Sequence, residues 1–501
     1  MANDLLNRRE RAFILWSPHQ PAAAPTLVIG KFQEGTPPTV AERQRFDLSS
    51  VAALTGLWSI AASACGLEDG DVYHYWFEVD NTLPGDTTQR ILVCDPFAFT
   101  VDWRVAAANQ PAAVIKFTGG RLVACDPEGA GLAALQGDAI NHLAANNQIV
   151  IYELPTAWSR QPRGGNTERA VGTFRDILAM VDRNAAGANF SDLRVTAIGN
   201  RYLVDLGVNA VELLPPADSI FDREWGYGTS HFLAPDFELG FPEGYSWPTA
   251  NQDLQKLAES FHQNGIRLFD DAVLGFAREG PHQHISFDEF HIQFDPQHPP
   301  NDPDAWSSRT GQARQDWGSK LFRYVRQTNS YDPTDGVVKS HPVARAFMYT
   351  YLARWMSDFQ LDGLRLDSIE TVANWDFVGT FAAQARQSFR DRAQAQGVSQ
   401  SAADARFLVV GEELSLPLDI IWQGRLDALW NDNFRKFIRA ALFGSNADGE
   451  PSFEWTVRKA IDCKLLGFTD GAQAVNYITS HDVEGPQKER LCTSFRYANF
   501  G

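Results

Sequence analysis

The sequence lacks the features that mark membrane, disulfide-stabilised and zinc-binding proteins. No apolar segment approaches the ~18 residues that a membrane-spanning helix needs. The cysteines are scattered, odd in number and without any CxxC spacing, which argues against a disulfide framework or a zinc site. Near the N-terminus the only apolar run, Ala12–Trp16, is too short for the core of a signal peptide. We therefore expect a cytoplasmic protein.

Basic residues are also few. The chain has 44 Lys and Arg against 62 Asp and Glu, a net charge of −18, which argues against nucleic acid or an anionic membrane as partner and suits a neutral substrate. Neither a glycine-rich phosphate loop nor a GxSxG elbow occurs, so nucleotide-binding and serine-hydrolase functions have no support. A length of 501 residues predicts two or three domains and leaves the oligomeric state open.

Residues 1–145 contain short runs of β-forming residues separated by turn residues. This pattern predicts a small antiparallel β-sandwich. The clearest of these runs are Ala12–Trp16, Val72–Val79, Arg90–Cys94 and Ala113–Phe117.

Residues 146–501 alternate instead between strand-type and helix-type segments, with helices expected at Asn251–Asn264, Pro342–Phe359 and Trp375–Gln396. Repeated β and α elements of this kind predict a parallel sheet, and their number favours a closed (β/α)₈ barrel. A long excursion at 276–341 breaks the alternation, and we expect it at the C-terminal face of the barrel, where active sites form. The predicted strands are Ile149–Leu154, Ala210–Leu214, Ile266–Val273, Gly363–Asp367, Phe407–Gly411, Ala428–Trp430 and Ala474–Ile478.

Three carboxylates, Asp367, Glu412 and Asp482, stand at or just beyond the C-terminal ends of separate predicted strands. Barrel closure would bring them to one mouth. Arg365 lies two residues before Asp367, so strand alternation points both side chains to one face, where the cation would lower the pKa of the carboxylate. Retaining glycosidases need two carboxyl groups about 5–5.5 Å apart, one an ionised nucleophile and the other a protonated acid.

Four segments, in order along the chain, read LFDDAVLGF, DGLRLDSIE, VVGEEL and ITSHD. WGYGTSHFLAP precedes them, after the second predicted strand, and WNDNFR follows the sixth predicted strand. With these motifs, the stretch from Gln148 to about Gly485 resembles the α-amylase family of glycoside hydrolases and transglycosylases. The N-terminal domain resembles the carbohydrate-binding-like sandwich that precedes the barrel in glycogen-branching and debranching members. The resemblance implies a (β/α)₈ barrel acting on α-glucans.

Residue by residue, the resemblance implies three catalytic carboxylates. Asp367 matches the nucleophile, Glu412 the general acid/base, and Asp482 the third acid, which grips sugar hydroxyls. We expect burial and acidic neighbours to raise the pKa of Glu412, and the adjacent Glu413 to point away.

The same comparison implies a set of substrate-binding residues. Arg365 matches the arginine beside the nucleophile, His481 a contact to a sugar hydroxyl, and Tyr227 the aromatic ring under the sugar. Trp225 is a further candidate for sugar stacking. Asp271 best fits the aspartate of the first motif, with Asp270 as the alternative register.

Two motifs depart from the family pattern. Gly275 and Phe276 stand where the first motif normally continues with Asn-His, so we expect no cofactor and regard a family-type calcium site as doubtful. Glu370 and Thr371 replace a Lys-His pair of many α-amylases, which predicts a different acceptor side of the cleft. An eighth barrel strand and a C-terminal β-domain are not evident in this chain.

His282, His284, His291 and His298 fall in the excursion at spacings that match no standard metal-ligand pattern, and we interpret them as solvated. No metal site is expected.

The sequence thus predicts a retaining glycoside hydrolase of internal α-1,4 bonds in starch, glycogen or maltodextrins. The alternatives are transfer that builds α-1,6 branches, α-1,6 debranching and, in another class, a non-catalytic glycan-binding protein with a degenerate barrel.

Overall fold

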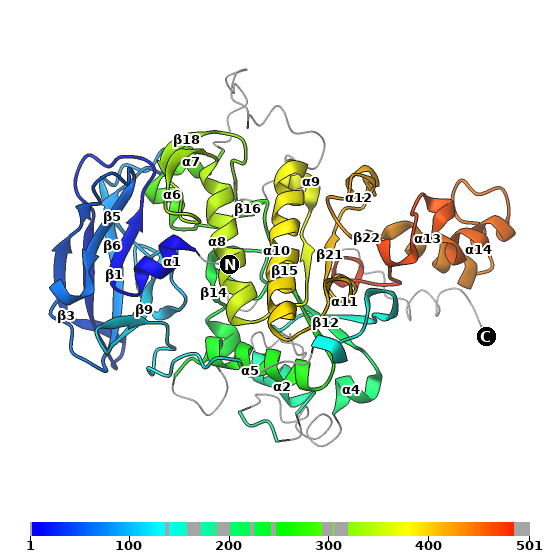
Figure 1. Cartoon of the computed structure of the whole chain (residues 1–501), viewed down its shortest axis with the longest axis horizontal. Coiled ribbons are helices and arrows are strands. Elements are labelled where there is room, and N and C mark those ends of the chain that lie inside the picture. The colour runs from blue at the N-terminus through cyan, green and yellow to red at the C-terminus, as the bar shows by residue number, and fades with distance from the viewer. Residues whose placement is uncertain are drawn as a thin grey trace.

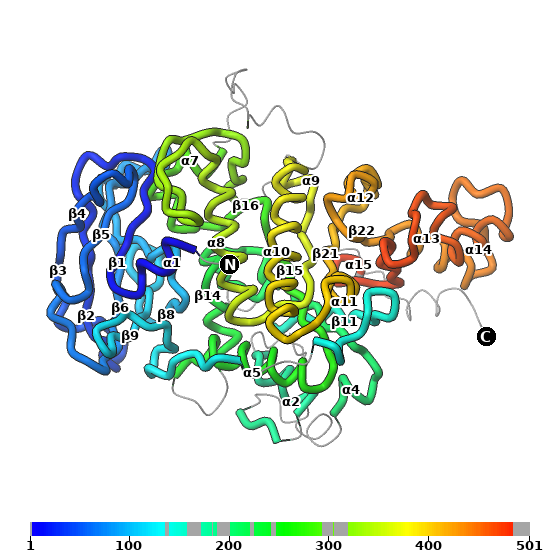
Figure 2. The backbone as a smooth tube through the Cα atoms, in the orientation of Figure 1, coloured from blue at the N-terminus to red at the C-terminus, as the bar shows by residue number. Residues whose placement is uncertain are grey.

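The computed structural model of the chain describes residues 3–135, 140–157, 172–182, 184–187, 201–220, 225–241, 247–292, 304 and 319–484. Figure 1 shows a β-rich unit at one end, a sheet with helices in the middle, and helices α13 (Asp432–Leu442) and α14 (Phe453–Ile461) at the other end. The tube in Figure 2 follows the chain from the first unit to the last in this same order. Within those residues, no helix has the length and apolar character that a membrane crossing requires.

The β-rich unit consists of two antiparallel sheets. One contains strands in the order β1-β5-β4, and the other follows β10-β9-β6-β2-β3, with β7 paired to β6 and β8 to β9. The four runs predicted here all fall on strands of these sheets. Their bounds are β1 (Ala12–Trp16), β2 (Thr26–Gln33), β3 (Thr39–Asp47), β4 (Ser49–Ser50), β5 (Leu57–Ala61), β6 (Val72–Asp80), β7 (Arg90–Val93), β8 (Val101–Ala107), β9 (Gln110–Thr118) and β10 (Arg121–Val123).

The central sheet is parallel, and its strands follow one another in sequence order. All seven barrel strands predicted from the sequence are present, so the barrel-type architecture is confirmed. Within the described part of the chain, no eighth strand lies between the two edge strands, β11 and β23. The strands are β11 (Ile151–Leu154), β12 (Ala210–Leu213), β15 (Arg267–Ala272), β20 (Gly363–Leu366), β21 (Leu408–Gly411), β22 (Ala428–Asn431) and β23 (Ala474–Asn476).

The register of these strands decides which side chains enter the barrel interior. Asp271 is in register with Arg365, so the two side chains share the inner face. Asp270 alternates to the outer face, where the Tyr351 hydroxyl of helix α8 (Val343–Asp358) donates a hydrogen bond to it. This outer position excludes Asp270 as the interior aspartate.

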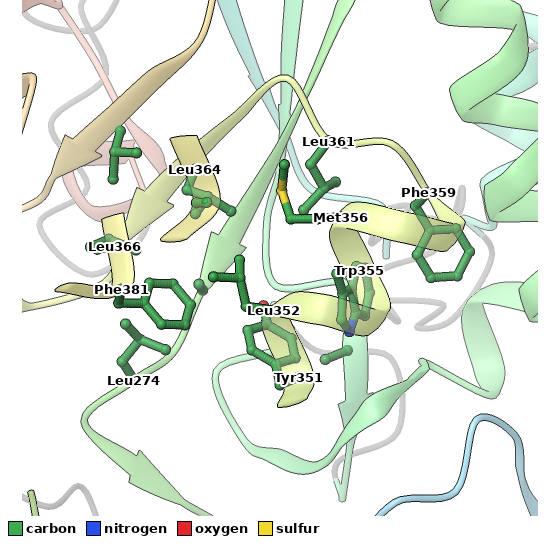
Figure 3. Packing of buried hydrophobic residues seen from close by; sticks show 14 of the residues in the cluster. Leu274, Tyr351, Leu352, Trp355, Met356, Phe359, Leu361, Leu364, Leu366 and Phe381 are labelled. Atoms are coloured by element: carbon green, nitrogen blue, oxygen red, sulfur yellow. The ribbon is translucent and has the colours of Figure 1, made fainter. Parts of the chain in front are cut away.

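Three helices predicted from the sequence cover the outer face of the sheet, namely α5 (Ala250–Gln263), α8 and α10 (Trp375–Ala395). Figure 3 shows Leu364 and Leu366 of β20 packed against residues of α8 and Phe381 of α10. Strands buried on both faces need apolar residues in succession, which explains the continuous runs in their sequences.

The first part of the long excursion packs between the two units. Helices α6 (His282–Ile285) and α7 (Phe287–Phe290) bury His282 and His291, and the ring of His282 stacks on Phe290 with centroids 3.8 Å apart. Burial lowers the pKa of His291 to about 3. The interpretation as solvated histidines is therefore wrong for His282, His284 and His291, because all three are buried. His298 lies outside the described residues.

Gly363 offers a test of interior packing. A Cβ at this position would overlap the ring of Phe269, which belongs to the barrel-interior cluster. We expect Gly363→Ala to destabilise the protein by about 1–3 kcal/mol, as overpacking does. Gly471→Ala, where a Cβ meets no neighbouring atom, is the control. Thermal unfolding measures both, and equal midpoints for the two variants would contradict this account of the core.

Candidate active site

Arg365 is the centre of the site. Its side chain is 1% exposed and lies on β20, from which it reaches carboxylates on three neighbouring segments. Nη1 donates to Asp271 Oδ1 at 2.6 Å and to Asp367 Oδ1 at 2.7 Å, while Nη2 lies 3.6 Å from Glu412 Oε2. The structure therefore brings these four residues together. The guanidinium also lies over the ring of Trp430, 4.8 Å from its centroid.

Burial governs the protonation of the two carboxylates proposed to react. Burial raises the pKa of Glu412 to about 8, with a contribution from Asp367, although Arg365 opposes the shift. The predicted rise is confirmed. For Asp367 the expected lowering is wrong, because burial raises its pKa by more than Arg365 lowers it. The guanidinium lies closer to Asp367 than to Glu412, so it favours charge on Asp367.

Glu412 and Glu413 follow the end of β21 and make different contacts. The backbone N–H of Ser368 donates to Glu412 Oε2 at 2.8 Å, which holds the acid beside the loop after β20. Glu413 Oε1 instead accepts a hydrogen bond from the Ser415 backbone.

Tyr227 and His481 form the opposite wall. The Tyr227 hydroxyl donates to Asp271 Oδ2 at 2.7 Å and lies 2.9 Å from His481 Nε2. The rings of Tyr227 and His481 stack with centroids 5.3 Å apart, and Trp225 packs edge-on against His481. Burial raises the pKa of Asp271 to about 6 despite its ion pair with Arg365.

The backbone around Trp225 and Tyr227 depends on a glycine between them. Gly226 has φ of +94°, and a Cβ there would overlap the carbonyl oxygen of Pro215. The segment connects β13 (Ala217–Ser219) to β14 (Thr229–Pro235), a hairpin that places both aromatic rings beside His481.

The sandwich supports this hairpin. Trp103 Nε1, on β8, donates to Asp218 Oδ1 at 3.1 Å, and Asp218 Oδ2 lies 2.9 Å from His231 Nδ1. Asp218 and His231 are both buried. The N-terminal unit thus holds the strands that present the aromatic residues of the site.

Asp482 lies on α15 (His481–Glu484) at the rim, with a side chain that is 40% exposed. Its Oδ1 lies 3.3 Å from His481 Nε2. It faces the same mouth as Asp367 but remains open to solvent, as a group that contacts an incoming sugar would.

The first motif departs from the family pattern at Gly275 and Phe276. Gly275 has no side chain, and Phe276 packs with Val273, Ile292 and Leu321 in an apolar cluster behind Tyr227. These two residues offer no side-chain oxygen as a ligand. In the described part of the chain, no group of three or more His, Cys, Asp or Glu is arranged to hold a metal ion.

Two acids of the interior were not predicted from the sequence. Glu153 on β11 and Glu212 on β12 are in register, and Glu212 is 3% exposed. Burial raises the pKa of Glu212 well above its ordinary value, and the charges of Glu153 and Asp271 add to the rise. Each of these acids stands alone in an apolar run, Glu153 in IYEL and Glu212 in AVEL, and this pattern could have identified them from the sequence.

A comparison with family models matches residues 183–419 to the α-amylase catalytic domain. The matched stretch of this chain is therefore similar to the α-amylase family. The matched residues include Arg365, Asp367 and Glu412, so the α-amylase motifs and the buried cluster coincide.

Curated relatives and solved structures give further likenesses. The chain is 29% identical over 198 residues to a 1,4-alpha-glucan branching enzyme from Thiobacillus denitrificans, covering 39% of this chain and 22% of that protein. It is 24% identical over 372 residues to one from Myxococcus xanthus, covering 74% of this chain and 39% of the relative. This chain thus spans well under half the length of these relatives.

Among solved structures, the fold is similar to pullulanases. The pullulanase from Paenibacillus barengoltzii in complex with maltohexaose and alpha-cyclodextrin superposes with a TM-score of 0.60 at 17% identity, covering 98% of this chain and 69% of that one. The maltotriose complex of pullulanase from Anoxybacillus sp. LM18-11 gives 0.59 at 17% identity, covering 98% and 62%. These likenesses support the α-amylase-family fold.

The protonation of Glu412 can be tested without substrate. Because its pKa rises from 4.5 to about 8 on folding, the stability it contributes is fully present below about pH 4.5 and is lost as the pH rises towards 8. In Glu412→Gln the side chain at this position cannot ionise. As the pH rises from 5 to 8, we expect the free energy of unfolding of the variant to increase relative to that of the wild type by a few kcal/mol, at about 1.4 kcal/mol per pKa unit. The thermal midpoint of the variant should rise relative to that of the wild type over the same pH range.

The control for this experiment is Glu68→Gln, which removes a carboxylate with 72% side-chain exposure from the sandwich. If the difference in thermal midpoint between the wild type and Glu412→Gln stays constant across this pH range, then Glu412 is ionised in the resting protein.

Proposed function

We propose that this chain is a retaining enzyme that cleaves α-glucosidic bonds in glucans by double displacement. The observation that carries the proposal is the pair Asp367 and Glu412 beside one guanidinium, with burial raising the pKa of Glu412 to about 8. At neutral pH this arrangement supplies a protonated acid beside a carboxylate that a cation helps to ionise. A glycan-binding protein has no need of such a pair.

In the first step Asp367 attacks the anomeric carbon while Glu412 gives its proton to the departing glycosidic oxygen. A covalent bond forms between Asp367 and the sugar as the glycosidic bond breaks. In the second step Glu412 takes a proton from a water or sugar hydroxyl, whose oxygen attacks the same carbon and releases Asp367. Two inversions leave the anomeric configuration retained.

The remaining residues of the site bind the substrate and stabilise the transition state. Positive charge develops on the sugar ring, and the carboxylates Asp271 and Asp482 near Asp367 stabilise it. Tyr227 and Trp225 offer aromatic surface for the sugar, and His481 offers a hydrogen bond to a hydroxyl. An α-glucan as substrate is supported by the relatives, whose names and complexes refer to 1,4-alpha-glucan and malto-oligosaccharides.

Hydrolysis of internal α-1,4 bonds is the first candidate for the overall reaction. Transfer that builds α-1,6 branches is the second, because the curated relatives are branching enzymes. Debranching of α-1,6 bonds is a further alternative, since the fold is similar to pullulanases. The three reactions share the same two carboxylates and differ in the bond cleaved and in the acceptor.

Amylose and amylopectin distinguish these reactions when reducing ends and iodine colour are followed together. New reducing ends on amylose are expected for α-1,4 hydrolysis. Loss of the amylose–iodine colour without new reducing ends would show branching transfer instead. New reducing ends on amylopectin alone would show debranching.

The role of Asp367 is tested by Asp367→Asn, which keeps the shape of the side chain but removes its nucleophilic charge. We expect turnover to fall by about 10⁴-fold or more, as the loss of a covalent nucleophile does, while binding of maltoheptaose persists. Calorimetry and a reducing-end assay measure the two effects. Glu413→Gln is the matched control. Turnover that survives in Asp367→Asn would remove Asp367 from the reaction.

A further inference from the structure

Glu153 is hydrogen-bonded to His481 through both of its carboxylate oxygens. Oε1 lies 2.7 Å from His481 Nδ1, and Oε2 accepts the backbone N–H of His481 at 2.8 Å. One acid therefore fixes both the ring and the peptide of His481. The contact joins β11, the first strand of the sheet, to the segment that follows β23, the last.

The hydrogen bonds around the ring determine its protons. The Tyr227 hydroxyl donates its proton to Asp271 Oδ2, so towards His481 Nε2, 2.9 Å away, the phenolic oxygen can only accept. Nε2 must then carry a hydrogen. Nδ1 faces a carboxylate oxygen, so it carries one as well. An imidazole that donates from both nitrogens is an imidazolium.

We propose that Glu153 is a positioning residue that keeps His481 a doubly protonated cation of fixed direction in the wall of the site. A sugar hydroxyl that enters beside Tyr227 then meets a charged donor, which binds it more strongly than a neutral ring would. This inference rests on the proposed function for its sugar ligand, and on the contacts alone for the state of His481.

The groups around His481 are consistent with this charge state. Burial lowers the pKa of His481, but the hydrogen bond and charge of Glu153 outweigh it, and the net pKa is raised. Arg365 opposes the cation, while Asp482, at 3.3 Å, favours it. Asp367 also interacts electrostatically with His481, and its negative charge favours the cation. The aromatic rings of Tyr227, Trp225 and Trp430 pack against the imidazole as well.

A carboxylate partner also offsets the charge repulsion that an imidazolium would exert on the transition state. The sugar becomes positively charged in the transition state, so an unpaired imidazolium beside it would oppose the reaction. Paired with Glu153, the imidazolium adds a strong donor with no net charge. The pair is enclosed, with side-chain exposures of 6% for His481 and 21% for Glu153, so water screens it little.

The experiment is a ¹⁵N NMR titration of the histidine rings without substrate, with the His481 signal assigned from His481→Gln. In the wild type we expect a pKa above 6.5. Glu153→Gln keeps an oxygen that accepts from Nδ1–H but loses the charge, and it should lower the pKa of His481 by about one unit or more. Glu413→Gln removes a carboxylate at the same mouth that accepts a hydrogen bond from the Ser415 backbone, and should leave that pKa unchanged.

Activity on amylose provides the second readout. In Glu153→Gln we expect kcat/KM at pH 7.5 to fall about 10- to 100-fold, as the loss of a charged hydrogen bond does, and to recover as the pH falls to 5.5 and the ring is protonated again. Glu153→Ala, which loses position as well as charge, should not recover. A merely structural role would give a loss that is independent of pH.

A wild-type pKa of His481 at or below 6.5 would overturn the proposal, and so would a pKa that Glu153→Gln leaves unchanged. The wild-type titration decides this even if a variant fails to fold. If the pKa falls in Glu153→Gln while the wild type acts on no glucan, the positioning by Glu153 stands and the proposed function fails.

Discussion

A single guanidinium, that of Arg365, balances the charge of the site. It contacts acids from β15 and from the ends of β20 and β21, and it is almost completely buried. Removing one partner from such a buried group costs about 3–5 kcal/mol, because the remaining charges stay uncompensated. One cation cannot neutralise Asp271, Asp367 and Glu412 together. The site therefore holds protons at neutral pH, which is what general acid catalysis needs.

The two units of the chain act together on this cluster. The sandwich contributes Trp103, which holds Asp218 and through it the hairpin that carries Trp225 and Tyr227. Helices α6 and α7 fill the space between the units with aromatic side chains and histidines. The geometry of the aromatic wall is thus fixed partly from outside the barrel.

Much of this architecture can be predicted from the sequence, for identifiable reasons. Buried parallel strands give short apolar runs between turn residues, so runs such as Gly363–Leu366 locate the strands to within a residue or two. Strand alternation then assigns Arg365 and Asp271 to one face. The motifs supply the candidate acids, whose mutual contacts the structure provides.

Other features depend on quantities that no linear pattern contains. The sign of the pKa shift of Asp367 requires burial to be weighed against Arg365. His282 looks solvated in a polar segment, but its neighbours Trp16 and Phe347 come from distant parts of the chain. Glu153 lies outside every motif, and its partner His481 is 328 residues away.

That separation has a consequence for how the protein is made. Contacts between distant residues close large loops and form late in folding, and parallel sheets are assembled slowly for this reason. Synthesis proceeds from the N-terminus, so the sandwich and the first six strands emerge before His481 does. A nascent chain therefore carries Arg365, its acids and Tyr227 before it carries His481, which completes the wall. The site comes into being only after the segment that follows β23 has been made and reaches back to the first strand.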